Sequence, residues 1–400
     1  MKSLVFSRKP ARYAAAMVAG ALRPGRGARF GPLSLRDVDP PDLPGDDWVR
    51  VRPRLAGICG SDLATLDGKS SRYFEPIVSF PFVPGHEIVG ELDDGSRVVV
   101  VPVLTCVTRG VDPVCDMCDA GRVNLCERIA YGHLEPGLQS GFCASTGGGW
   151  STSMIAHTSQ LVPVPDDLSD EAAVLIEPTA CAVHAASGIG DDEIAVIGAG
   201  ALGLLTIAAI ADQCAPSGPF VATAKHPDQR RWAKELGAKT VCAPGELDRV
   251  VRSATRSHML DNGQLTCGID AVVDCVGSED SLAQALRVVA PGGTVYAVGM
   301  PGVTTLDLTP LWHREVALRG VYAYTHGDTA FVDDDGNDYA EDDDFATAID
   351  LIRRLDLGRL VSATYPLARY EDAITHAANA GSRGAVKIAF DLRNERERNL

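Results

Sequence analysis

Apolar positions follow two different patterns along the chain, and the change falls near residue 170. Before that point, short apolar runs such as residues 48–53 and 97–101 are separated by proline and glycine, which is typical of β-strands joined by tight turns. After it, apolar strands alternate with longer helical segments, which predicts a parallel sheet covered by helices. In this second part we expect strands at residues 194–197, 220–223, 271–274 and 294–298, and helices at residues 171–187, 202–211, 228–236 and 281–289.

The end of the chain has a mixed pattern, with helices expected at residues 345–355 and 370–380 and a closing strand at residues 385–390. The 400 residues are 46% apolar and 22% charged, which is typical of globular proteins and sufficient for two domains with separate cores. Residues 12–29 are rich in alanine, glycine and arginine, and the pattern places no element there. The predicted fold class is α/β, with a β-rich part and a parallel-sheet part.

A glycine-rich turn follows the expected strand at residues 194–197 and precedes the expected helix at residues 202–211. Its sequence is Gly198-Ala199-Gly200-Ala201-Leu202-Gly203. In this context the first two glycines let the backbone approach a pyrophosphate, and the helix amino terminus offers unpaired N–H groups and a positive dipole end. The turn therefore predicts a dinucleotide-binding site rather than a tight turn alone.

The choice between NAD and NADP depends on the end of the strand at residues 220–223. An acidic side chain there would bind the ribose 2′-hydroxyl of NAD, but we align Ala224 with this position. Ala224 has no carboxylate to repel a 2′-phosphate, and the adjacent Lys225 and His226 could attract one. We therefore predict a preference for NADP; the alternative is that Lys225 is a solvated surface charge and that either cofactor serves.

Three separate segments carry side chains suited to a first metal ion. Cys59 lies in the sequence Gly-Ile-Cys-Gly-Ser-Asp, and His86 and Glu87 lie in Pro-Gly-His-Glu. Glu177 precedes Pro178 in the region that leads to the glycine turn. A thiolate, an imidazole and a carboxylate form a donor set that suits zinc. Residue types alone do not show that they meet in space, since each could be a core thiol, a buried histidine or a surface acid.

Together with the glycine turn, these segments resemble the zinc-dependent medium-chain alcohol dehydrogenase superfamily, in which they occur in the same order and at similar spacing. The resemblance covers nearly the whole chain. Glu177 stands where many alcohol dehydrogenases have a zinc-binding cysteine, so the most similar branch is that of the sorbitol, threonine and glucose dehydrogenases. The resemblance implies a GroES-like catalytic domain at residues 1–180, completed by residues 323–400, and a Rossmann NAD(P)-binding domain at residues 181–322.

The resemblance also implies a role for each matching residue at the catalytic zinc. Cys59 and His86 would bind the metal ion. Glu87 and Glu177 would bind it directly, exchange with water or lie beside it. Ser61 would hydrogen-bond the substrate hydroxyl and begin a proton relay.

Further residues of this site follow from the same resemblance. Asp62 would orient the imidazole of the zinc-binding histidine. Family members often carry a histidine two residues later, but here that position is Ala64, so the relay would continue through the cofactor ribose, Thr65 or water. Near the nicotinamide, the resemblance places Val276, Val298, Gly299 and Met300.

A second cysteine cluster, Cys115, Cys118 and Cys126, has the spacing of the last three ligands of the family's structural zinc site. The family's first cysteine would fall at Asp112, so the fourth ligand is missing, or is Asp112, or is Cys106. We predict an occupied zinc site; the alternatives are a lobe that has lost its metal and a disulfide between Cys115 and Cys118. The remaining cysteines are expected to be small buried hydrophobic residues: Cys143, Cys181, Cys214, Cys242, Cys267 and Cys275.

The chain has 37 Lys and Arg against 53 Asp and Glu, a net charge of −16. This disfavours nonspecific binding to nucleic acid and to anionic membranes, both of which depend on cationic side chains. We recognise neither a secretory signal nor an apolar run of roughly eighteen residues, so we expect a cytoplasmic protein with reduced cysteines. Residues 328–344 contain nine acids and no Lys or Arg, and we expect a solvated loop that ends at a helix amino terminus.

These observations predict a zinc-dependent oxidoreductase that transfers a hydride between an alcohol, polyol or sugar hydroxyl, or the matching aldehyde or ketone, and NAD(P). Its partners would be a small-molecule substrate and further copies of the chain, as a dimer or tetramer. Two alternatives stay open. One is elimination or isomerisation next to a carbonyl with bound cofactor, and the other is a non-enzymatic NADP-binding redox sensor that uses the cysteine lobe as its switch.

Overall fold

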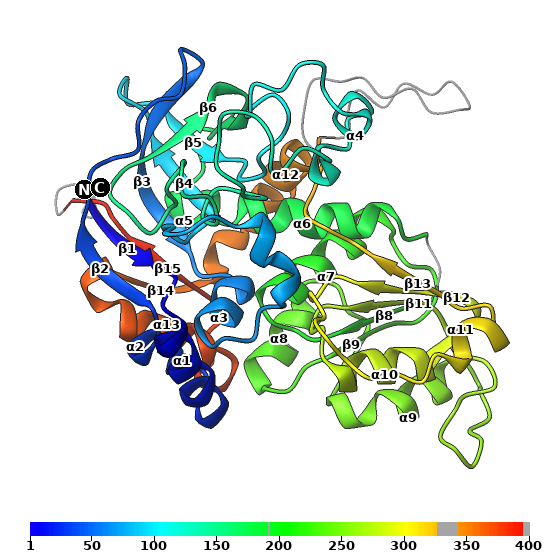
Figure 1. Cartoon of the computed structure of the whole chain (residues 1–400). Helices are drawn as coiled ribbons and strands as arrows, with labels where there is room; N and C mark the ends of the chain where they lie inside the picture. Colours follow the sequence, from blue (N-terminus) through cyan, green and yellow to red (C-terminus); the bar gives the residue numbers. More distant parts are fainter. Residues whose placement is uncertain (191–192, 326–342, 395–400) are drawn as a thin grey trace. The chain divides into compact units, whose positions relative to one another are not determined.

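A computed structural model describes residues 1–190, 193–325 and 343–394 of the chain (Figure 1). The chain divides into two compact units: unit 1 consists of Met1–Glu177 and Thr325–Leu400, and unit 2 is the continuous segment Pro178–Tyr324. The α/β fold class predicted from the sequence is confirmed, with a β-rich unit and a parallel-sheet unit. Among the described residues, no helix combines the length and the apolar character needed to span a membrane.

Unit 1 is built around a mainly antiparallel sheet (Figure 1). Its strands are ordered β14 (Val361–Tyr365), β15 (Lys387–Asp391), β3 (Trp48–Gly57), β4 (Ile88–Glu91), β5 (Arg97–Val100) and β7 (Leu161–Pro163), while β6 (Met154–His157) pairs with β3. The long strand β3 pairs with β15, β4 and β6, so it joins the beginning of the chain to its end. The side chains of Val51, Ile88 and Val98 are buried together on this sheet.

An additional lobe precedes this sheet. β1 (Lys2–Phe6) and β2 (Leu33–Asp37) pair with each other, and α1 (Pro10–Leu22) and α2 (Gly27–Phe30) lie between them in the sequence. These helices form in the stretch for which the apolar pattern predicted no element. Asp67 is buried, and its carboxylate accepts the N–H groups of Gly25 at 2.9 Å and Gly27 at 3.0 Å. This carboxylate therefore ties the turn between α1 and α2 to the rest of unit 1.

The helix predicted at residues 171–187 is instead two helices, α5 (Asp170–Ala173) and α6 (Ile176–Ser187). The prediction of one helix is wrong because Pro178 has no backbone N–H to donate to a preceding turn, so a new helix begins just before it. α6 crosses from unit 1 into unit 2 at Pro178. Unit 1 also contains α3 (Gly60–Leu66), α4 (Asp116–Asp119), α12 (Asp344–Leu355) and α13 (Tyr370–Ala378). Short 3₁₀ helices in the two units span Arg72–Ile77, Val123–Leu125, Thr158–Gln160, Pro244–Glu246, Leu357–Leu360, Leu367–Arg369 and Gly381–Arg383.

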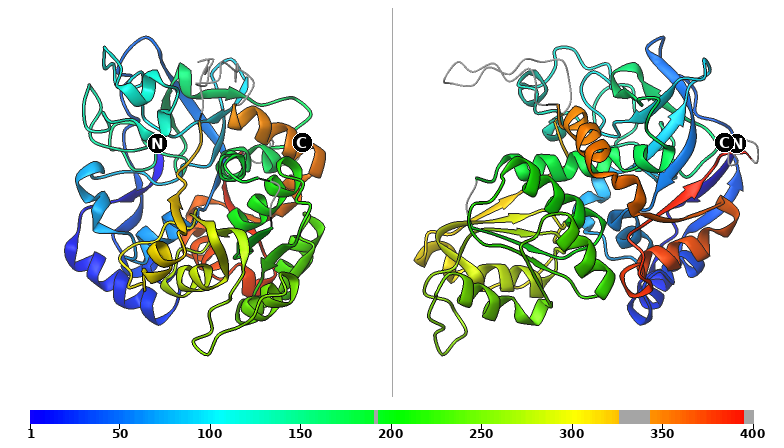
Figure 2. Two further views of the ribbon diagram at one scale, coloured as in Figure 1. Left: turned by 90° about the vertical axis from the view of Figure 1, so that its right-hand side faces the viewer. Right: turned by 180° about the vertical axis from the view of Figure 1, so that it is seen from behind.

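Unit 2 contains a parallel sheet with helices on both faces (Figures 1 and 2). The strand order is β10 (Thr240–Cys242), β9 (Phe220–Thr223), β8 (Ile194–Ile197), β11 (Ile269–Asp274), β12 (Val289–Ala297) and β13 (Ala317–Gly320). The connecting helices are α7 (Ala201–Gln213), α8 (Pro227–Glu235), α9 (Leu247–Ala254), α10 (Glu279–Val288) and α11 (Thr309–His313). β8 and β9 have the predicted bounds because each is a short, fully buried apolar run with turn residues on both sides.

β12 begins earlier than predicted and continues through the Pro291-Gly292-Gly293 sequence that was expected to separate a helix from a strand. The pairing with β11 shifts register between Ile269 and Ala271, which marks a bulge. Gly292 has a φ of +75°, and a Cβ on Gly293 would lie 2.5 Å from the carbonyl oxygen of Asp270. The glycines therefore allow the strand to bend and do not end it.

Two further expectations, one about a cysteine and one about the acidic stretch, are compared with the structure next. Cys267 was expected to be buried, but it is exposed, because it follows a surface hairpin in which Met259 and Leu265 pair. Most of the acidic stretch at residues 328–344 lies outside the described residues. Its last part is described: the Asp343 carboxylate accepts the N–H of Phe345 at 2.8 Å and so caps α12.

Candidate metal and cofactor sites

The first predicted metal ligand lies at the start of α3. Cys59 is the residue before the helix, and its backbone N–H donates to Asp62 Oδ2 at 3.0 Å. This capping interaction fixes the first turn of the helix. As a result, the side chains of Cys59, Ser61 and Asp62 are held on one short, well-defined turn of unit 1.

His86 lies against this turn and is buried, with 4% of its surface exposed. Its Nε2 is 3.3 Å from Ser61 Oγ, and its Nδ1 is 3.6 Å from Asp62 Oδ1. The second distance is longer than a hydrogen bond, so Asp62 faces the ring without hydrogen-bonding to it. Neither His86 Nδ1 nor Asp62 Oδ1 has a hydrogen-bond partner in the described structure.

Negative groups surround this imidazole. Burial lowers the pKa of His86, but the charge of Asp62, a hydrogen bond with Cys59 and the charge of Glu177 raise it more, so the pKa lies well above its usual value. Glu177, in the first turn of α6, is also buried. A thiol, an imidazole and a carboxylate that share so much negative charge form a donor set that fits a zinc ion.

The carboxylate of Glu87 is paired with a positively charged side chain of the same protein. It is buried, and it forms an ion pair with the buried Lys387 of β15. Burial lowers the pKa of Lys387, but Glu87, Cys59 and Glu177 raise it more. Of the roles considered for Glu87, this ion pair favours a position beside the metal. Lys387 was missed from the sequence, although a single lysine in an apolar closing strand was a signal.

Gly57 of β3 is required by this ion pair. A Cβ at this position would lie 1.9 Å from Glu87 Oε2, and the Gly57 N–H donates to the Glu87 carbonyl at 2.8 Å. A side chain larger than hydrogen would therefore displace the carboxylate. This close approach explains why glycine precedes the Ile-Cys-Gly-Ser-Asp sequence.

The proton relay beyond Ser61 was left open between Thr65, the cofactor ribose and water. The Thr65 hydroxyl donates to the Ser61 carbonyl oxygen at 2.9 Å and lies 2.9 Å from Ser70 Oγ. Its single proton is thus used by the backbone, and the Ser61 hydroxyl faces His86 instead. This geometry does not favour Thr65 as the next member of the relay.

The second cluster brings four cysteines together: Cys106, Cys115, Cys118 and Cys126. Their sulfur atoms all lie within 4.8 Å of one another, and among the described residues no other group of three or more potential ligands is as compact. Cys106 therefore occupies the fourth corner, whereas Asp112 is exposed. No disulfide links Cys115 to Cys118, because all eleven cysteines are free.

Backbone groups also point at these sulfur atoms. The N–H of Cys115 donates to Cys106 Sγ at 3.3 Å, and that of Arg128 donates to Cys126 Sγ at 3.4 Å. Hydrogen bonds from Cys118 above all, and from neighbouring groups, lower the pKa of Cys126 to about 5. By contrast, burial above all raises the pKa of Cys106 to about 11, and a hydrogen bond with Cys126 above all raises that of Cys118. Four cysteines gathered in this way are the usual ligand set of a structural zinc ion, which deprotonates the thiols when it binds.

The glycine turn of unit 2 has the geometry that pyrophosphate binding requires. Gly198 has a φ of +96°, and its N–H donates to Thr223 Oγ1 at 2.9 Å. A Cβ on Gly203 would lie 1.9 Å from the Gly198 carbonyl oxygen, so α7 packs directly on the turn. A Cβ on Gly200 would meet nothing within 4 Å, which leaves open space at the amino terminus of α7. Ala201 and Leu202 form the first turn of that helix.

An arginine missed from the sequence lies at the position expected to distinguish the two cofactors. Ala224 is buried after β9, and its carbonyl oxygen accepts the Nε–H of Arg230 at 3.0 Å. Lys225 and Arg230 are exposed, and His226 caps α8. The end of β9 is thus surrounded by cationic groups with no acid at Ala224. The sequence feature that could have indicated Arg230 is its position in the first turn of the predicted helix.

The ends of β11 and β12 lie backbone to backbone. Asp274 is buried, and its carboxylate accepts the N–H groups of Val276 at 2.9 Å and Gly277 at 3.2 Å. Its carbonyl oxygen accepts the N–H groups of Val298 at 3.0 Å and Gly299 at 2.8 Å. This bonding leaves the side chains of Val276 and Met300, predicted to lie near the nicotinamide, exposed at the carboxyl ends of the strands.

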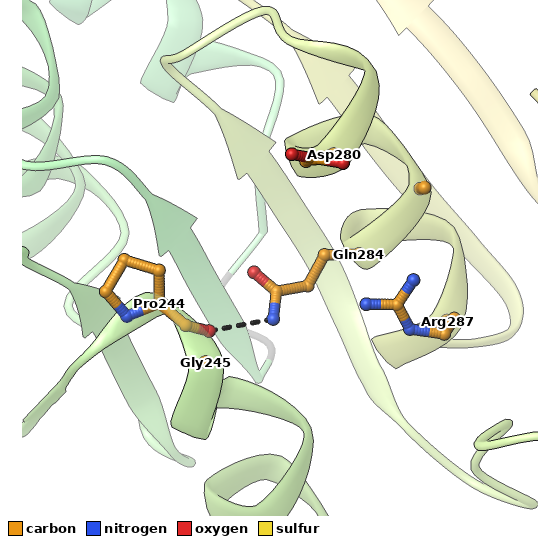
Figure 3. Close-up of a pocket in the computed structure, with 6 residues that line it drawn as sticks. Pro244, Gly245, Asp280, Gln284 and Arg287 are labelled. Atoms are coloured by element: carbon orange, nitrogen blue, oxygen red, sulfur yellow. Dashed lines mark hydrogen bonds between the residues drawn. The ribbon is translucent and has the colours of Figure 1, made fainter. Parts of the chain in front are cut away.

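A cavity of about 290 Å³ in unit 2 is lined by residues outside these predictions (Figure 3). The side chain of Gln284 on α10 reaches across it and donates to the Pro244 carbonyl oxygen at 2.8 Å. The remaining lining residues are Gly245, Asp280, Ala283 and Arg287. None of the predicted metal or cofactor residues contributes to it, so we assign the chemistry to the clusters above.

Comparison with known proteins defines the family. Residues 45–166 match the model of the alcohol dehydrogenase GroES-like domain, and residues 201–334 match that of the zinc-binding dehydrogenase domain. The chain therefore belongs to the zinc-dependent alcohol dehydrogenase superfamily, as the resemblance predicted. The predicted arrangement of a GroES-like domain and a Rossmann-type parallel sheet is also confirmed.

Two named relatives place the chain in the sorbitol-type branch. Sorbitol dehydrogenase of Arabidopsis thaliana is 28% identical, with 91% of this chain and 92% of that protein covered. L-idonate 5-dehydrogenase of Vitis vinifera is 26% identical, with 86% and 88% covered. Among solved structures, an alcohol dehydrogenase from Thermus sp. ATN1 superposes with a TM-score of 0.67 at 25% identity, covering 98% of this chain and 100% of that one.

Proposed function

We propose that this chain is a zinc-dependent oxidoreductase that transfers a hydride between the hydroxyl of an alcohol, polyol or sugar and NADP. The observation that carries the proposal is the buried His86, with the partly buried Cys59 and Ser61 beside it and the charge of the buried Glu177 acting on the same imidazole. The names of the sorbitol and idonate dehydrogenase relatives support a polyol as substrate. They favour neither of the alternatives, elimination or isomerisation and redox sensing.

Residues of unit 1 would have three roles in the reaction: binding zinc, accepting the hydroxyl proton and balancing buried charge. Zinc held by Cys59, His86 and Glu177 would act as a Lewis acid that lowers the pKa of the substrate hydroxyl. Ser61, whose Oγ is 3.3 Å from His86 Nε2, is placed to accept the hydroxyl proton. Lys387 balances the charge of Glu87, so that this buried carboxylate does not compete for the metal. NADP, when bound, would supply the hydride acceptor for the carbon that carries this hydroxyl.

The function is tested by following reduced nicotinamide by absorbance while alcohols, polyols and sugars are offered with NADP and with NAD. We expect turnover of added cofactor with at least one polyol. Product formed without net change in the cofactor would instead support elimination or isomerisation. An absence of turnover with every substrate, while zinc and NADP are both bound, would contradict the proposed enzyme.

We further propose that Arg230, together with Lys225, recognises the 2′-phosphate of NADP. We expect Arg230→Ala to lower kcat/KM for NADP roughly tenfold, the value of one exposed charge-assisted hydrogen bond, and to leave NAD unaffected. Arg231→Ala is the matched control, because Arg231 lies on the same helix but pairs with Asp228 and Glu235. Kinetics with both cofactors decide the question, and a clear preference of the unaltered chain for NAD would refute the assignment.

We propose that the protein forms a homo-oligomer through the edge of unit 2. β13 is the last strand of the sheet, and all four of its residues are exposed. Trp312, five residues before β13 in the sequence, adds exposed apolar surface. No strand in the described part of the chain pairs with the outer edge of β13, and such an edge with apolar neighbours favours pairing with a second copy. The mass of the protein in solution tests this, and the mass of a single chain would contradict it.

We also propose that the enzyme works in the cytoplasm. Its eleven cysteines are all free, and the four-cysteine cluster and the proposed zinc ligand Cys59 depend on these thiols staying reduced. Fractionation of the cells that make the protein, followed by immunodetection, measures this directly. Recovery outside the cytoplasm would contradict it.

A further inference from the structure

Arg109 is a fully buried arginine, with 0% of its surface exposed, in the segment that joins Cys106 to Cys115. Its guanidinium does not bind a carboxylate. Instead it donates to backbone carbonyl oxygens of a single turn, those of Tyr131 at 3.2 Å, Leu134 at 3.4 Å, Glu135 at 3.3 Å and Gly137. Both terminal nitrogens of the planar guanidinium fork are used, Nη1 for the first three of these acceptors and Nη2 for the fourth, whereas Nε has no hydrogen-bond partner among the described residues.

The backbone of Arg109 contacts the same turn as its side chain. Its carbonyl oxygen accepts the N–H of His133 at 3.1 Å. Gly132 has a φ of +79°, and a Cβ there would lie 2.1 Å from that carbonyl oxygen. The turn at residues 131–137 therefore rests on Arg109 through its main chain and its side chain together, and its position follows that of the cysteine lobe.

The turn at residues 131–137 contacts the segment that follows it, up to Cys143. Cys143 Sγ donates to the Glu135 carbonyl oxygen at 3.3 Å, and a Cβ on Gly137 would lie 2.5 Å from the Cβ of Cys143. The preceding residue, Phe142, places its ring centroid 5.8 Å from that of His86 and 5.3 Å from that of Phe82. A displacement of the turn would thus move an aromatic ring that contacts the proposed metal-binding histidine.

Charge links Arg109 to the state of the cysteines. Burial lowers the pKa of Arg109, whereas Cys143, Cys126 and Cys106 raise it. Cysteines that hold a metal ion are thiolates, and four of them outweigh the charge of Zn²⁺, so a loaded lobe is anionic. A buried guanidinium is more stable beside an anionic lobe than beside neutral thiols. The loaded lobe therefore favours the position of Arg109 in which it holds the turn.

We propose that Arg109 is a positioning residue that couples the cysteine lobe to the reaction, by holding the turn that seats Phe142 against His86. The inference rests on the proposed function only for the role of His86. It predicts that the Phe142 ring lines the site beside the metal-binding histidine. It also predicts that the position of this ring depends on the hydrogen bonds of the Arg109 guanidinium. Loss of the fork would loosen substrate fit and leave Cys59, Ser61 and His86 in place.

Arg109→Lys tests the coupling, because it keeps the positive charge and removes the planar fork. We expect faster amide hydrogen exchange across residues 131–143 and a rise in substrate KM of about 10- to 100-fold, with kcat and zinc content nearly unchanged. Arg122→Lys, the same change at an exposed position of the lobe, is expected to alter neither quantity. Unchanged exchange at residues 131–143 in the Arg109 variant would overturn the proposal.

A double-mutant cycle with Phe142→Ala separates this role from a general loss of stability. If Arg109 acts through Phe142, the double variant has the same KM as Phe142→Ala alone. Independent, additive effects on KM would refute the coupling. Removal of zinc from the lobe of the unaltered chain should accelerate exchange in the same turn. The exchange measurements need no turnover, so failure of the proposed dehydrogenase activity would be seen separately in the unaltered chain.

Discussion

Cys59→Ser is expected to abolish most of the activity and to release the catalytic zinc. Replacing the thiolate by a hydroxyl removes the softest of the proposed ligands, and the lost Lewis acid is worth several kcal/mol, so kcat/KM should fall by about a thousandfold or more. Serine is a favourable residue at the helix cap that Cys59 occupies, so α3 and the rest of unit 1 should remain folded. Metal analysis and steady-state kinetics measure the two effects together.

Cys267→Ser is the matched control, because Cys267 is exposed and belongs to neither metal cluster. It makes the same chemical change, and we expect both activity and zinc content to stay as they are. If Cys59→Ser kept its catalytic zinc and its activity, the proposed ligand set would be wrong.

Cys106→Ser is expected to remove the structural zinc and to lower the thermal midpoint strongly. Zinc binding to four-ligand structural sites is worth about 10–16 kcal/mol of apparent free energy, so loss of one of four thiolates affects folding of the whole lobe. Asp112→Asn is the informative partner, because the family spacing points to this position while the structure places it on the surface. It should change neither property.

The two variants are compared after dialysis against a chelator, by zinc content and by thermal unfolding. Retention of the lobe zinc in Cys106→Ser together with its loss in Asp112→Asn would show that the aspartate is the ligand. That result would also require the loop between Cys106 and Cys115 to adopt a different conformation.

Features set by neighbouring residues were predictable from the sequence. β8 and the Gly198–Gly203 turn are specified locally, by a short apolar run and by the glycines at 198 and 203, whose conformation or packing excludes larger side chains. The role of Arg230 was harder to predict, because its guanidinium reaches the Ala224 carbonyl oxygen only once the first turn of α8 has formed. The pattern of strands and turns thus indicated where the cofactor binds more readily than which side chains complete the site.

Features that depend on distant pairing could not be predicted. Lys387 reaches Glu87 only because β15 pairs with β3, which lies at the other end of unit 1 in the sequence. Cys106 joins Cys115 because the intervening segment folds back, and periodicity carries no information about such a loop. The break between α5 and α6 is a local feature that was nevertheless missed. The proline that marks it is visible in the sequence, but the alanine-rich pattern on both sides led to the prediction of a single helix.

The pairing of β15 with β3 also sets the order in which the protein can be completed on the ribosome. Unit 2 is continuous and ends at Tyr324, so its sheet can form while the remaining residues are still being translated. The sheet of unit 1 is completed later, because the strand that brings the Lys387 ammonium to Glu87 follows the whole of unit 2 in the sequence. Until then residues 55–57 of β3 lack the strand that pairs with them, and an unpaired strand edge of this kind is open to pairing with another chain.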